Sequence, residues 1–235
     1  MLPSGRPDFT RVVPCQCNQG ETEEERRSRL RRESGELKLE LLRNMTLENF
    51  EKRPNLSREE RENLESAFND ARSFAEAPKD WIVFLGLNGC GKTHLAAAIG
   101  NHQLKKGMPV IFVFVPDFLD HLRSTFSPDG RVAHDELFDK VKNAPLLILD
   151  DFGEQASTPW AQEKLYQLIN HRYNDRLPTV ITTCLALEDM ETRIGSRLAD
   201  PRLVSVVNIM APDYRSDLTT SERGKQQNQR LRRTR

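Results

Sequence analysis

Five short runs of branched or aromatic residues, separated by stretches long enough to hold a helix, constrain the fold of this chain more than any other feature. Runs of this composition and length are typical of strands that are buried on both faces of a sheet. Parallel strands need crossover connections of such length, and these crossovers are right-handed. We therefore predict an α/β fold with a doubly wound parallel sheet. The predicted strands cover residues 81–85, 110–115, 146–149, 179–183 and 204–209.

The segments between these runs have the residue spacing of helices. A further helix is predicted before the first strand, because Ser57 and Glu60 form a capping box and apolar residues follow at helical spacing up to Pro78. The helices predicted between the strands cover residues 92–106, 116–126, 133–143, 159–176 and 187–199.

The first predicted strand runs directly into a phosphate-loop pattern, in which Gly86 is followed after four residues by Gly91, Lys92 and Thr93. The glycines let backbone N–H groups converge on phosphate oxygens, the lysine adds a positive charge, and the threonine hydroxyl ligates Mg²⁺. The helix that follows points its positive N-terminus at the same anion. The sequence therefore predicts a nucleoside triphosphate site. Its predicted ligand-contacting residues are Gly86, Asn88, Gly89, Cys90, Gly91, Lys92, Thr93 and His94.

The third predicted strand ends in two carboxylates, Asp150 and Asp151. Downstream of a phosphate loop, one such acid is expected near Mg²⁺ and the other near the attacking water. We predict that Asp150 and Thr93 form the magnesium site and that Asp151 orients or deprotonates the water. Glu154 is an alternative base. The short side chain of Asp151 indicates slow turnover.

Five segments, taken in order and spacing, resemble a known family. They are GLNGCGKTHLAAAIGN, LLILDDFG, TVITT, RIGSRLADPRL and APDYRSDL. Together they look like an AAA+ ATPase of the DnaC/DnaI/IstB helicase-loader group, and the resemblance covers residues 45–218. It implies a P-loop NTPase (AAA+) three-layer fold around a five-stranded parallel sheet of order 5-1-4-3-2, with a short helical N-terminal extension.

The resemblance also implies roles for three arginines. Arg197 matches the arginine finger, which stabilises charge on the nucleotide of an adjacent copy, so a homo-oligomer is expected. Arg202 is the alternative finger. Arg215 matches the second sensor, which contacts the phosphate bound to its own copy.

Two further positions are less defined by the resemblance. Relatives often carry asparagine as the first sensor where this sequence has Cys184, so the polar contact falls to a neighbouring threonine. We predict Thr183 as this contact, with Thr182 as the alternative. Phe50 resembles the segment that lines the adenine pocket, and an ordinary core phenylalanine is the alternative interpretation.

Residues 116–143 fall where loaders and initiators insert a helix that lines a path for single-stranded DNA. The phenylalanines of this region offer stacking surfaces, although an amphipathic core helix also explains them. Acidic residues at 135, 136 and 139 argue against a simple basic groove. The residues considered for DNA contact are Phe114, Phe118, Arg123, Phe126, Arg131, Lys140 and Lys142.

Composition limits the remaining possibilities. The 35 basic and 35 acidic residues cancel, so net charge does not favour a polyanionic partner, although residues 26–32 and 224–235 form two basic runs. No apolar run has the roughly 18 residues that span a bilayer, so we expect a cytoplasmic protein without a membrane partner. The four cysteines are expected to be free thiols or metal ligands.

Three segments are predicted along the chain. Residues 1–45 resemble part of a helicase-interaction region and a linker, in which Cys15 and Cys17 supply only half of the four ligands that a structural zinc needs. Residues 46–218 form the AAA+ domain, and residues 219–235 form a basic, disordered tail.

The resemblance implies an ATP-dependent and Mg²⁺-dependent DNA-replication protein, an ATPase that loads the replicative helicase onto single-stranded DNA. One alternative is a transposition helper of the IstB type. A second alternative is a nucleotide-gated adaptor with negligible turnover.

Overall fold

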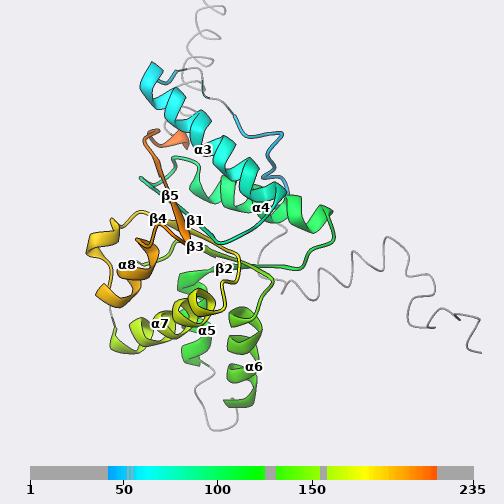
Figure 1. The fold of residues 1–235 in the computed structure, drawn as a ribbon, viewed down its shortest axis with the longest axis vertical. Helices are drawn as coiled ribbons and strands as arrows, with labels where there is room; N and C mark the ends of the chain where they lie inside the picture. The colour runs from blue at the N-terminus through cyan, green and yellow to red at the C-terminus, as the bar shows by residue number, and fades with distance from the viewer. Residues whose placement is uncertain (1–41, 52, 54, 125–130, 154–157, 216–235) are drawn as a thin grey trace, which may run out of the picture.

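The computed structural model describes residues 42–51, 53, 55–124, 131–153 and 158–215 (Figure 1). The predicted N-terminal segment with Cys15 and Cys17, the tail over 219–235, and the side chains of Phe126 and Glu154 therefore lie outside the described residues. No helix among the described residues combines the length and the apolar character that crossing a membrane requires.

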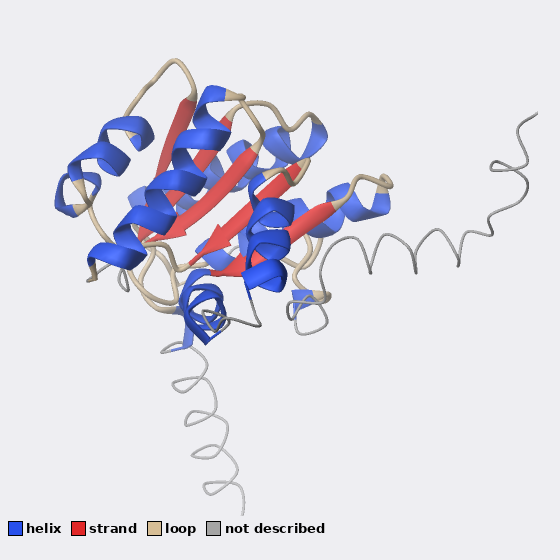
Figure 2. Cartoon of the chain, turned by 90° about the horizontal axis from the view of Figure 1, so that it is seen from below, coloured by secondary structure: helices blue, strands red, loops and turns tan. Residues whose placement is uncertain are grey.

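A single five-stranded sheet forms the middle layer, and its strands pair in parallel in the order β2-β3-β4-β1-β5 (Figure 2). Read from the other edge, this is the predicted order 5-1-4-3-2, which is confirmed. All residues of β2 except its last, and all residues of β3 and β4, are buried, as expected for strands covered on both faces. The strands are β1 (Trp81–Gly86), β2 (Val110–Phe114), β3 (Leu146–Asp150), β4 (Thr179–Thr183) and β5 (Val204–Ile209).

Helices cover both faces of the sheet. One face packs against α3 (Arg58–Glu76) and α4 (Lys92–Lys105), and the buried side chains there form one hydrophobic cluster. The other face forms a second cluster with the remaining α-helices. These are α5 (Val115–Ser124), α6 (Arg131–Lys142), α7 (Pro159–Asn174) and α8 (Thr192–Leu198). The three-layer arrangement is visible in Figure 1.

The capping box predicted for the first described helix is present in α3. The Ser57 hydroxyl accepts a hydrogen bond from the backbone N–H of Glu60, and the Glu60 carboxylate accepts one from the backbone N–H of Ser57. Both bonds satisfy N–H groups that the first turn of a helix leaves without an intrahelical partner.

The prediction of one helix over residues 187–199 is wrong. The structure has a short 3-10 helix, η2 (Leu187–Asp189), followed by a break and then α8. The Glu191 carboxylate accepts a hydrogen bond from the backbone N–H of Ile194 and thereby caps a new helix start. A helix therefore begins within the segment that the residue spacing predicts to be a single helix.

The order of the strands determines where a site can form. Strand β1 lies between β4 and β5, and the loop of residues 87–91 joins β1 to α4. Because all strands are parallel, the carboxyl ends of β1, β3 and β4 meet at one edge of the sheet. The phosphate-loop and Asp150 motifs both lie at this edge.

Candidate functional site

The loop between β1 and α4 has the backbone conformation that the phosphate-loop pattern predicts. Gly89 and Gly91 have φ angles of +74° and +112°, which side chains rarely tolerate. Gly91 is the N-cap of α4 and caps it with no side chain, so the backbone N–H groups of the first turn remain available to a ligand. The loop is therefore built to bind an anion through its backbone.

Lys92, the first residue of α4, is only 9% exposed. Its ammonium donates hydrogen bonds to the backbone carbonyl oxygens of Gly86 at 2.7 Å and Leu87 at 2.9 Å. The charge is therefore held over the loop by neutral acceptors, where a phosphate oxygen is a stronger partner.

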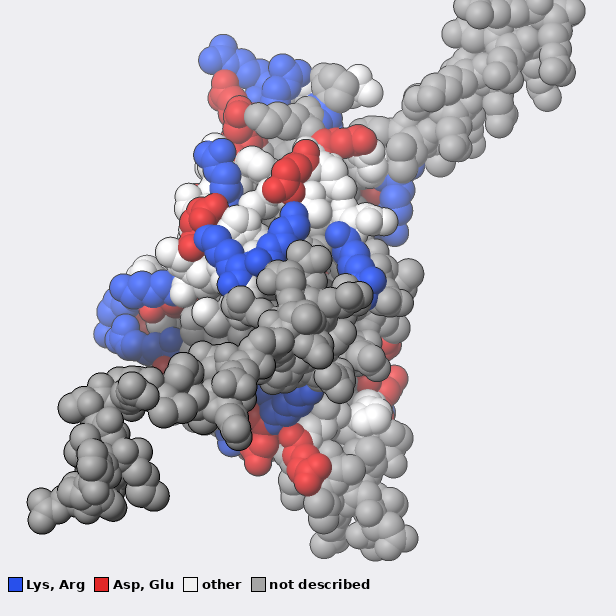
Figure 3. All heavy atoms as spheres, turned by 90° about the vertical axis from the view of Figure 1, so that its right-hand side faces the viewer, with Lys and Arg blue, Asp and Glu red and all other residues white. Residues whose placement is uncertain are grey.

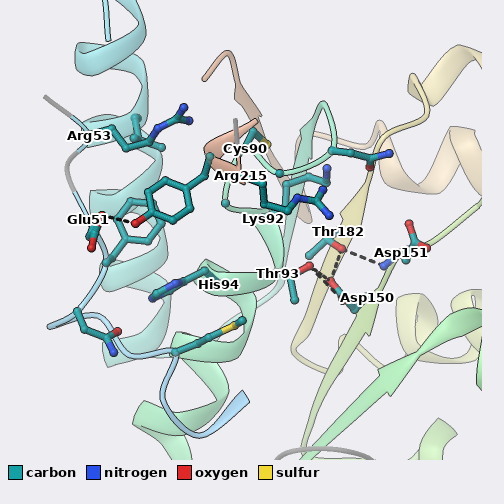
Figure 4. A pocket seen from close by; sticks show the side chains of 18 of the residues that line it. Glu51, Arg53, Cys90, Lys92, Thr93, His94, Asp150, Asp151, Thr182 and Arg215 are labelled. Carbon is teal, nitrogen blue, oxygen red and sulfur yellow. Dashed lines mark hydrogen bonds between the residues drawn. The ribbon is translucent and has the colours of Figure 1, made fainter. Parts of the chain in front are cut away.

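The loop opens onto a pocket of about 740 Å³ (Figure 4). Gly86 does not line the pocket and contributes through its carbonyl bond to Lys92. Cys90 is buried, and burial raises the pKa of its thiol, so it remains neutral. The other predicted loop residues all line the pocket, namely Asn88, Gly89, Cys90, Gly91, Lys92, Thr93 and His94.

Asp150 ends β3 beside the start of α4. The hydroxyl of Thr93 donates to its carboxylate at 2.9 Å, and the hydroxyl of Thr182 donates to it at 2.6 Å (Figure 4). Burial raises the pKa of the Asp150 carboxyl group, while the bonds from Thr182 and Thr93 act in the opposite direction. A buried carboxylate and a hydroxyl that converge in this way are hard oxygen donors, and they fit Mg²⁺.

Asp151 also lines the pocket, and its backbone has a left-handed φ of +57°. Its backbone N–H donates to the Thr182 hydroxyl at 3.0 Å. In Figure 4, Asp151 lies next to Asp150 at the opposite end of the pocket from Arg53. The two neighbouring acids therefore have different surroundings: the Asp150 carboxylate accepts a hydrogen bond from Thr93, and Asp151 is bonded to Thr182 through its backbone N–H.

Thr182 and Thr183 point to opposite faces of β4, as neighbouring strand residues do. The hydroxyl of Thr183 accepts a hydrogen bond from the backbone N–H of Leu185 at 3.1 Å, and Thr183 does not line the pocket. Thr182 lines the pocket and bonds to Asp150. Of the two threonines considered as the first sensor, Thr182, the alternative, is therefore the one that lines the pocket.

Phe50 lies at the end of the pocket formed by the segment before α3. Its ring stacks on Phe68 with centroids 5.6 Å apart and meets the His94 ring edge-on at 5.1 Å. His94 is itself held by a 3.0 Å bond between its Nε2 and the carbonyl oxygen of Thr46. Phe50 therefore combines the two interpretations of its sequence position, because it packs on α3 and also lines the pocket.

Contacts between distant segments, which no sequence pattern predicts, lie at this end of the pocket. The Tyr214 hydroxyl donates to the Glu51 carboxylate, and the Arg53 guanidinium donates to the carbonyl oxygen of Pro212. Arg53 also lies over the Tyr214 ring, 5.6 Å from its centroid. These four residues, which we call the clasp, join the segment before α3 to the segment after β5.

Arg215 follows the clasp and lines the pocket. Its guanidinium bonds to Asp213 at 3.1 Å, and Asp213 lies against Gly89 of the phosphate loop. The hydrogen bonds from the backbone N–H and the side chain of Arg215 lower the pKa of the Asp213 carboxyl group. Arg215 is therefore near the phosphate loop and is paired with an acid that lies against it.

Comparison with known proteins decides the family. The family model for the IstB-like ATP binding protein matches residues 20–207, which is most of the chain. The chain belongs to this family. The predicted membership of the DnaC/IstB-type AAA+ proteins is therefore confirmed.

Relatives within the AAA+ class agree with this result. The chain is 30% identical over 138 residues to the replicative helicase loader DnaC of Escherichia coli (strain K12), which covers 57% of this chain and 56% of that protein. It is 29% identical over 119 residues to the DnaC of Buchnera aphidicola subsp. Baizongia pistaciae, covering 51% of this chain and 48% of that protein. The chain thus spans about half the length of these relatives.

Solved structures show the same fold. The crystal structure of the DnaC helicase loader superposes with a TM-score of 0.57 at 25% identity, covering 72% of this chain and 98% of that one. The crystal structure of DnaI gives a TM-score of 0.57 at 23% identity, covering 74% of this chain and 92% of that one. The IstB-like chain therefore has the AAA+ fold of these proteins.

The predicted arginine finger of this IstB-like chain, Arg197, and its alternative, Arg202, differ in their surroundings. Arg202 is paired with Asp200, with its Nε at 2.9 Å and its Nη2 at 2.8 Å from the carboxylate. Arg197 lies on α8 and is held by groups of α7, among them the Asn170 side-chain oxygen at 2.6 Å. Neither arginine lines the described pocket of its own copy. Within one copy, Arg197 therefore lies apart from the residues that line this pocket.

Part of the region considered for DNA contact packs in the hydrophobic core. Phe118 is buried and stacks on Phe138, with centroids 6.4 Å apart. Arg123 lies over the Trp160 ring at 5.5 Å, and Lys142 pairs with Asp139 at 3.6 Å. On the face shown in Figure 3, basic and acidic side chains of the described residues are interspersed. The burial of Phe118 and its stacking on Phe138 support its alternative interpretation as a core residue.

Proposed function

We propose that the chain binds ATP and Mg²⁺ in the pocket and hydrolyses the nucleotide while it loads the replicative helicase onto single-stranded DNA in the cytoplasm. The observation that carries the nucleotide part is the convergence of Lys92, Thr93 and Asp150 at one edge of the sheet. The loader part is supported by the similarity to proteins named replicative helicase loader DnaC.

In this proposal the loop supplies both the positive charge and the backbone donors. The Lys92 ammonium leaves the carbonyl oxygens of Gly86 and Leu87 for phosphate oxygens, and the first N–H groups of α4 bind the same anion. Thr93 and Asp150 hold Mg²⁺, which when bound neutralises phosphate charge. The base of the nucleotide lies toward Phe50, next to His94.

Asp151 acts on the attacking water. Its backbone is fixed by Thr182, which also donates to Asp150, so one threonine sets the relative position of the two acids. Aspartate reaches less far than glutamate, which accounts for slow turnover. In a single-turnover assay, Asp151→Asn should bind ATP with unchanged affinity and not cleave it. Normal cleavage by this variant would exclude Asp151 as the base.

The arginines couple the nucleotide to assembly. Arg215 leaves Asp213 for the phosphate in its own copy, and Arg197 reaches the phosphate in an adjacent copy. Nucleotide binding then stabilises the interface between copies, and hydrolysis releases it.

The loader function is tested by its partner. The tagged chain, incubated with Mg²⁺ and ATP, should retain the replicative hexameric helicase, and Lys92→Met should lose this retention. The same chain should show ATPase activity that changes when single-stranded DNA is added. Retention of the helicase by neither form would exclude the loader function.

A transposition helper is the second candidate, favoured by the match to the IstB-like family model. It is distinguished by retention of a transposase in place of the helicase in the same experiment. The third candidate, an adaptor with negligible turnover, is favoured by the short side chain of Asp151. It requires ATP-dependent partner retention with no multiple-turnover hydrolysis.

A further inference from the structure

Three arginines lie on or near α8, and two of them are neutralised by acids. Arg193 bonds to Glu191 at 2.8 Å, and Arg202 bonds to Asp200 at 2.8 Å. Arg197 differs from both. Among the described residues, no carboxylate forms an ion pair with it.

Neutral groups of α7 hold Arg197 instead. Its Nη2 donates to the side-chain oxygen of Asn170 at 2.6 Å and to the Tyr166 hydroxyl at 3.3 Å. Its guanidinium carbon lies 4.9 Å from the centroid of the Tyr166 ring and 5.7 Å from that of the Tyr173 ring. Residues 166, 170 and 173 are spaced along one face of a helix. We call Tyr166, Asn170 and Tyr173 the α7 cradle.

The chemistry of the α7 cradle suits a cation that must act on an external anion. Ring faces and an amide oxygen orient a guanidinium and offset part of its desolvation, but they do not cancel its charge. A carboxylate in their place would have to be displaced before a phosphate could bind. The Nε of Arg197 is buried without a hydrogen-bond partner among the described residues, so the side chain retains an unused donor.

We propose that Asn170, supported by Tyr166, is a positioning residue that holds Arg197 for contact with the nucleotide of a neighbouring copy. The inference rests on the proposed role of Arg197 as a trans-acting finger. Residues of α7 orient the finger, and the side chain at position 170 must be neutral so that it does not pair with the charge of Arg197. Asn170 itself touches neither the nucleotide nor the water.

Mixed oligomers can assign a defect to one side of the interface. The acceptor copy carries Arg197→Ala and keeps an intact pocket, whereas the donor copy carries Asp151→Asn and keeps its finger. Turnover in the mixture then arises only where a donor finger meets an acceptor pocket. Absence of turnover with an otherwise unmodified donor would contradict the proposed trans role of Arg197, before Asn170 is tested at all.

If the mixture of donor and acceptor copies shows turnover, position 170 of the donor is changed next. Asn170→Asp in the donor should reduce kcat of the mixture at least about tenfold, because the new carboxylate pairs with Arg197. The same substitution in the acceptor, which lacks the finger, should leave turnover within about twofold. KM for ATP should not change in either mixture, since the acceptor pocket is intact.

Asn174→Asp is the matched control, because Asn174 lies one turn further along α7 and is exposed. It adds the same charge to the same helix and should leave donor activity unchanged. Tyr166→Phe, which keeps the ring, should reduce turnover by less than about threefold. Full rescue by the Asn170→Asp donor, with thermal unfolding and oligomer formation like those of Asn174→Asp, would overturn the proposal. An equal defect from donor and acceptor would overturn it too.

Discussion

Two buried cations lie at opposite ends of the sheet, and both are held by backbone carbonyl oxygens. Lys92, at the carboxyl end of β1, bonds to two carbonyl groups of its own loop. Arg172, in α7, is fully buried and bonds to the carbonyl oxygens of Lys142, Ala144 and Pro178. Of these two residues, Lys92 lines the described pocket and Arg172 does not.

The two cations differ in their contacts, and this difference separates a residue that stabilises the fold from one that can bind a ligand. Arg172 joins the segments that precede β3 and β4, which are far apart in the sequence, and its Nε also donates to the Thr179 hydroxyl. Burial lowers the pKa of its guanidinium to about 9, so it remains charged at neutral pH. The partners of Lys92 lie only five and six residues before it, so its bonds close a local loop. Arg172 therefore supports the fold, whereas Lys92 is available to a ligand.

The largest predicted effect is at Arg172. Arg172→Met should lower the free energy of unfolding by about 3 kcal/mol or more, because several buried acceptors lose their donor at once. Urea denaturation followed by circular dichroism measures the change. The control is Arg176→Met, an exposed arginine just beyond α7, which should change stability by less than about 0.5 kcal/mol. Equal losses of stability from the two substitutions would contradict the role of Arg172 in supporting the fold.

The second effect is at Lys92 and should appear in binding rather than in stability. Lys92→Met should weaken ATP binding at least about 30-fold, since a charge-assisted bond to phosphate is lost. The free energy of unfolding should stay within about 1 kcal/mol of the parent chain. Isothermal titration and urea denaturation measure the two quantities. Lys105→Met, at the exposed end of the same helix, should change neither. A stability loss as large as that of Arg172→Met would contradict the assignment.

The buried carboxyl group of Asp150 provides a further test at the pocket end of the sheet, because its ionisation depends on pH. Burial raises its pKa above the ordinary 3.8, so the folded state retains a proton that the unfolded state has lost. Stability of the ligand-free chain should therefore fall as pH rises from 3.8 through the raised pKa. Asp150→Asn should remove this slope and raise stability at pH 7 by up to about 1 kcal/mol, while abolishing the strengthening of ATP binding by Mg²⁺. Urea midpoints across this pH range test the sign, and a stability loss in the variant would contradict it.

The clasp should give the smallest effect. Tyr214→Phe removes the bond to Glu51 and should speed ATP dissociation by about threefold, with less than about 0.5 kcal/mol change in stability. Stopped-flow displacement of a fluorescent ATP analogue measures the rate. Glu51→Gln should act similarly, and the double variant should be no faster than either single one, because all three remove the same contact. Additive effects would exclude a shared bond.

Sequence patterns predicted much of the fold because buried parallel strands and phosphate loops impose local requirements. Strands β4 and β5 have their predicted ranges, and β1, β2 and β3 each differ by one residue at the carboxyl end. The break at Glu191 was missed because periodicity does not register a side-chain cap. The choice between Thr182 and Thr183 depends on which face of the sheet carries the Asp150 side chain, and this is set by the register of β3 and β4.

Contacts between distant segments could not be predicted from one sequence. Tyr214 and Glu51 are 163 residues apart, and nothing in either neighbourhood points to the other. Arg172 has the sequence position of an ordinary helical arginine, and its burial follows only from the close approach of two loops. Asn170 acquires its significance only from its contact with Arg197.

The central claim, that the pocket above Lys92 takes ATP with Mg²⁺, is tested most directly by equilibrium dialysis of radiolabelled ATP against the folded chain. The folded chain should retain about one ATP per chain in the presence of Mg²⁺, and Lys92→Met should lose that retention. Absence of retention by parent chain that unfolds cooperatively in urea would contradict it.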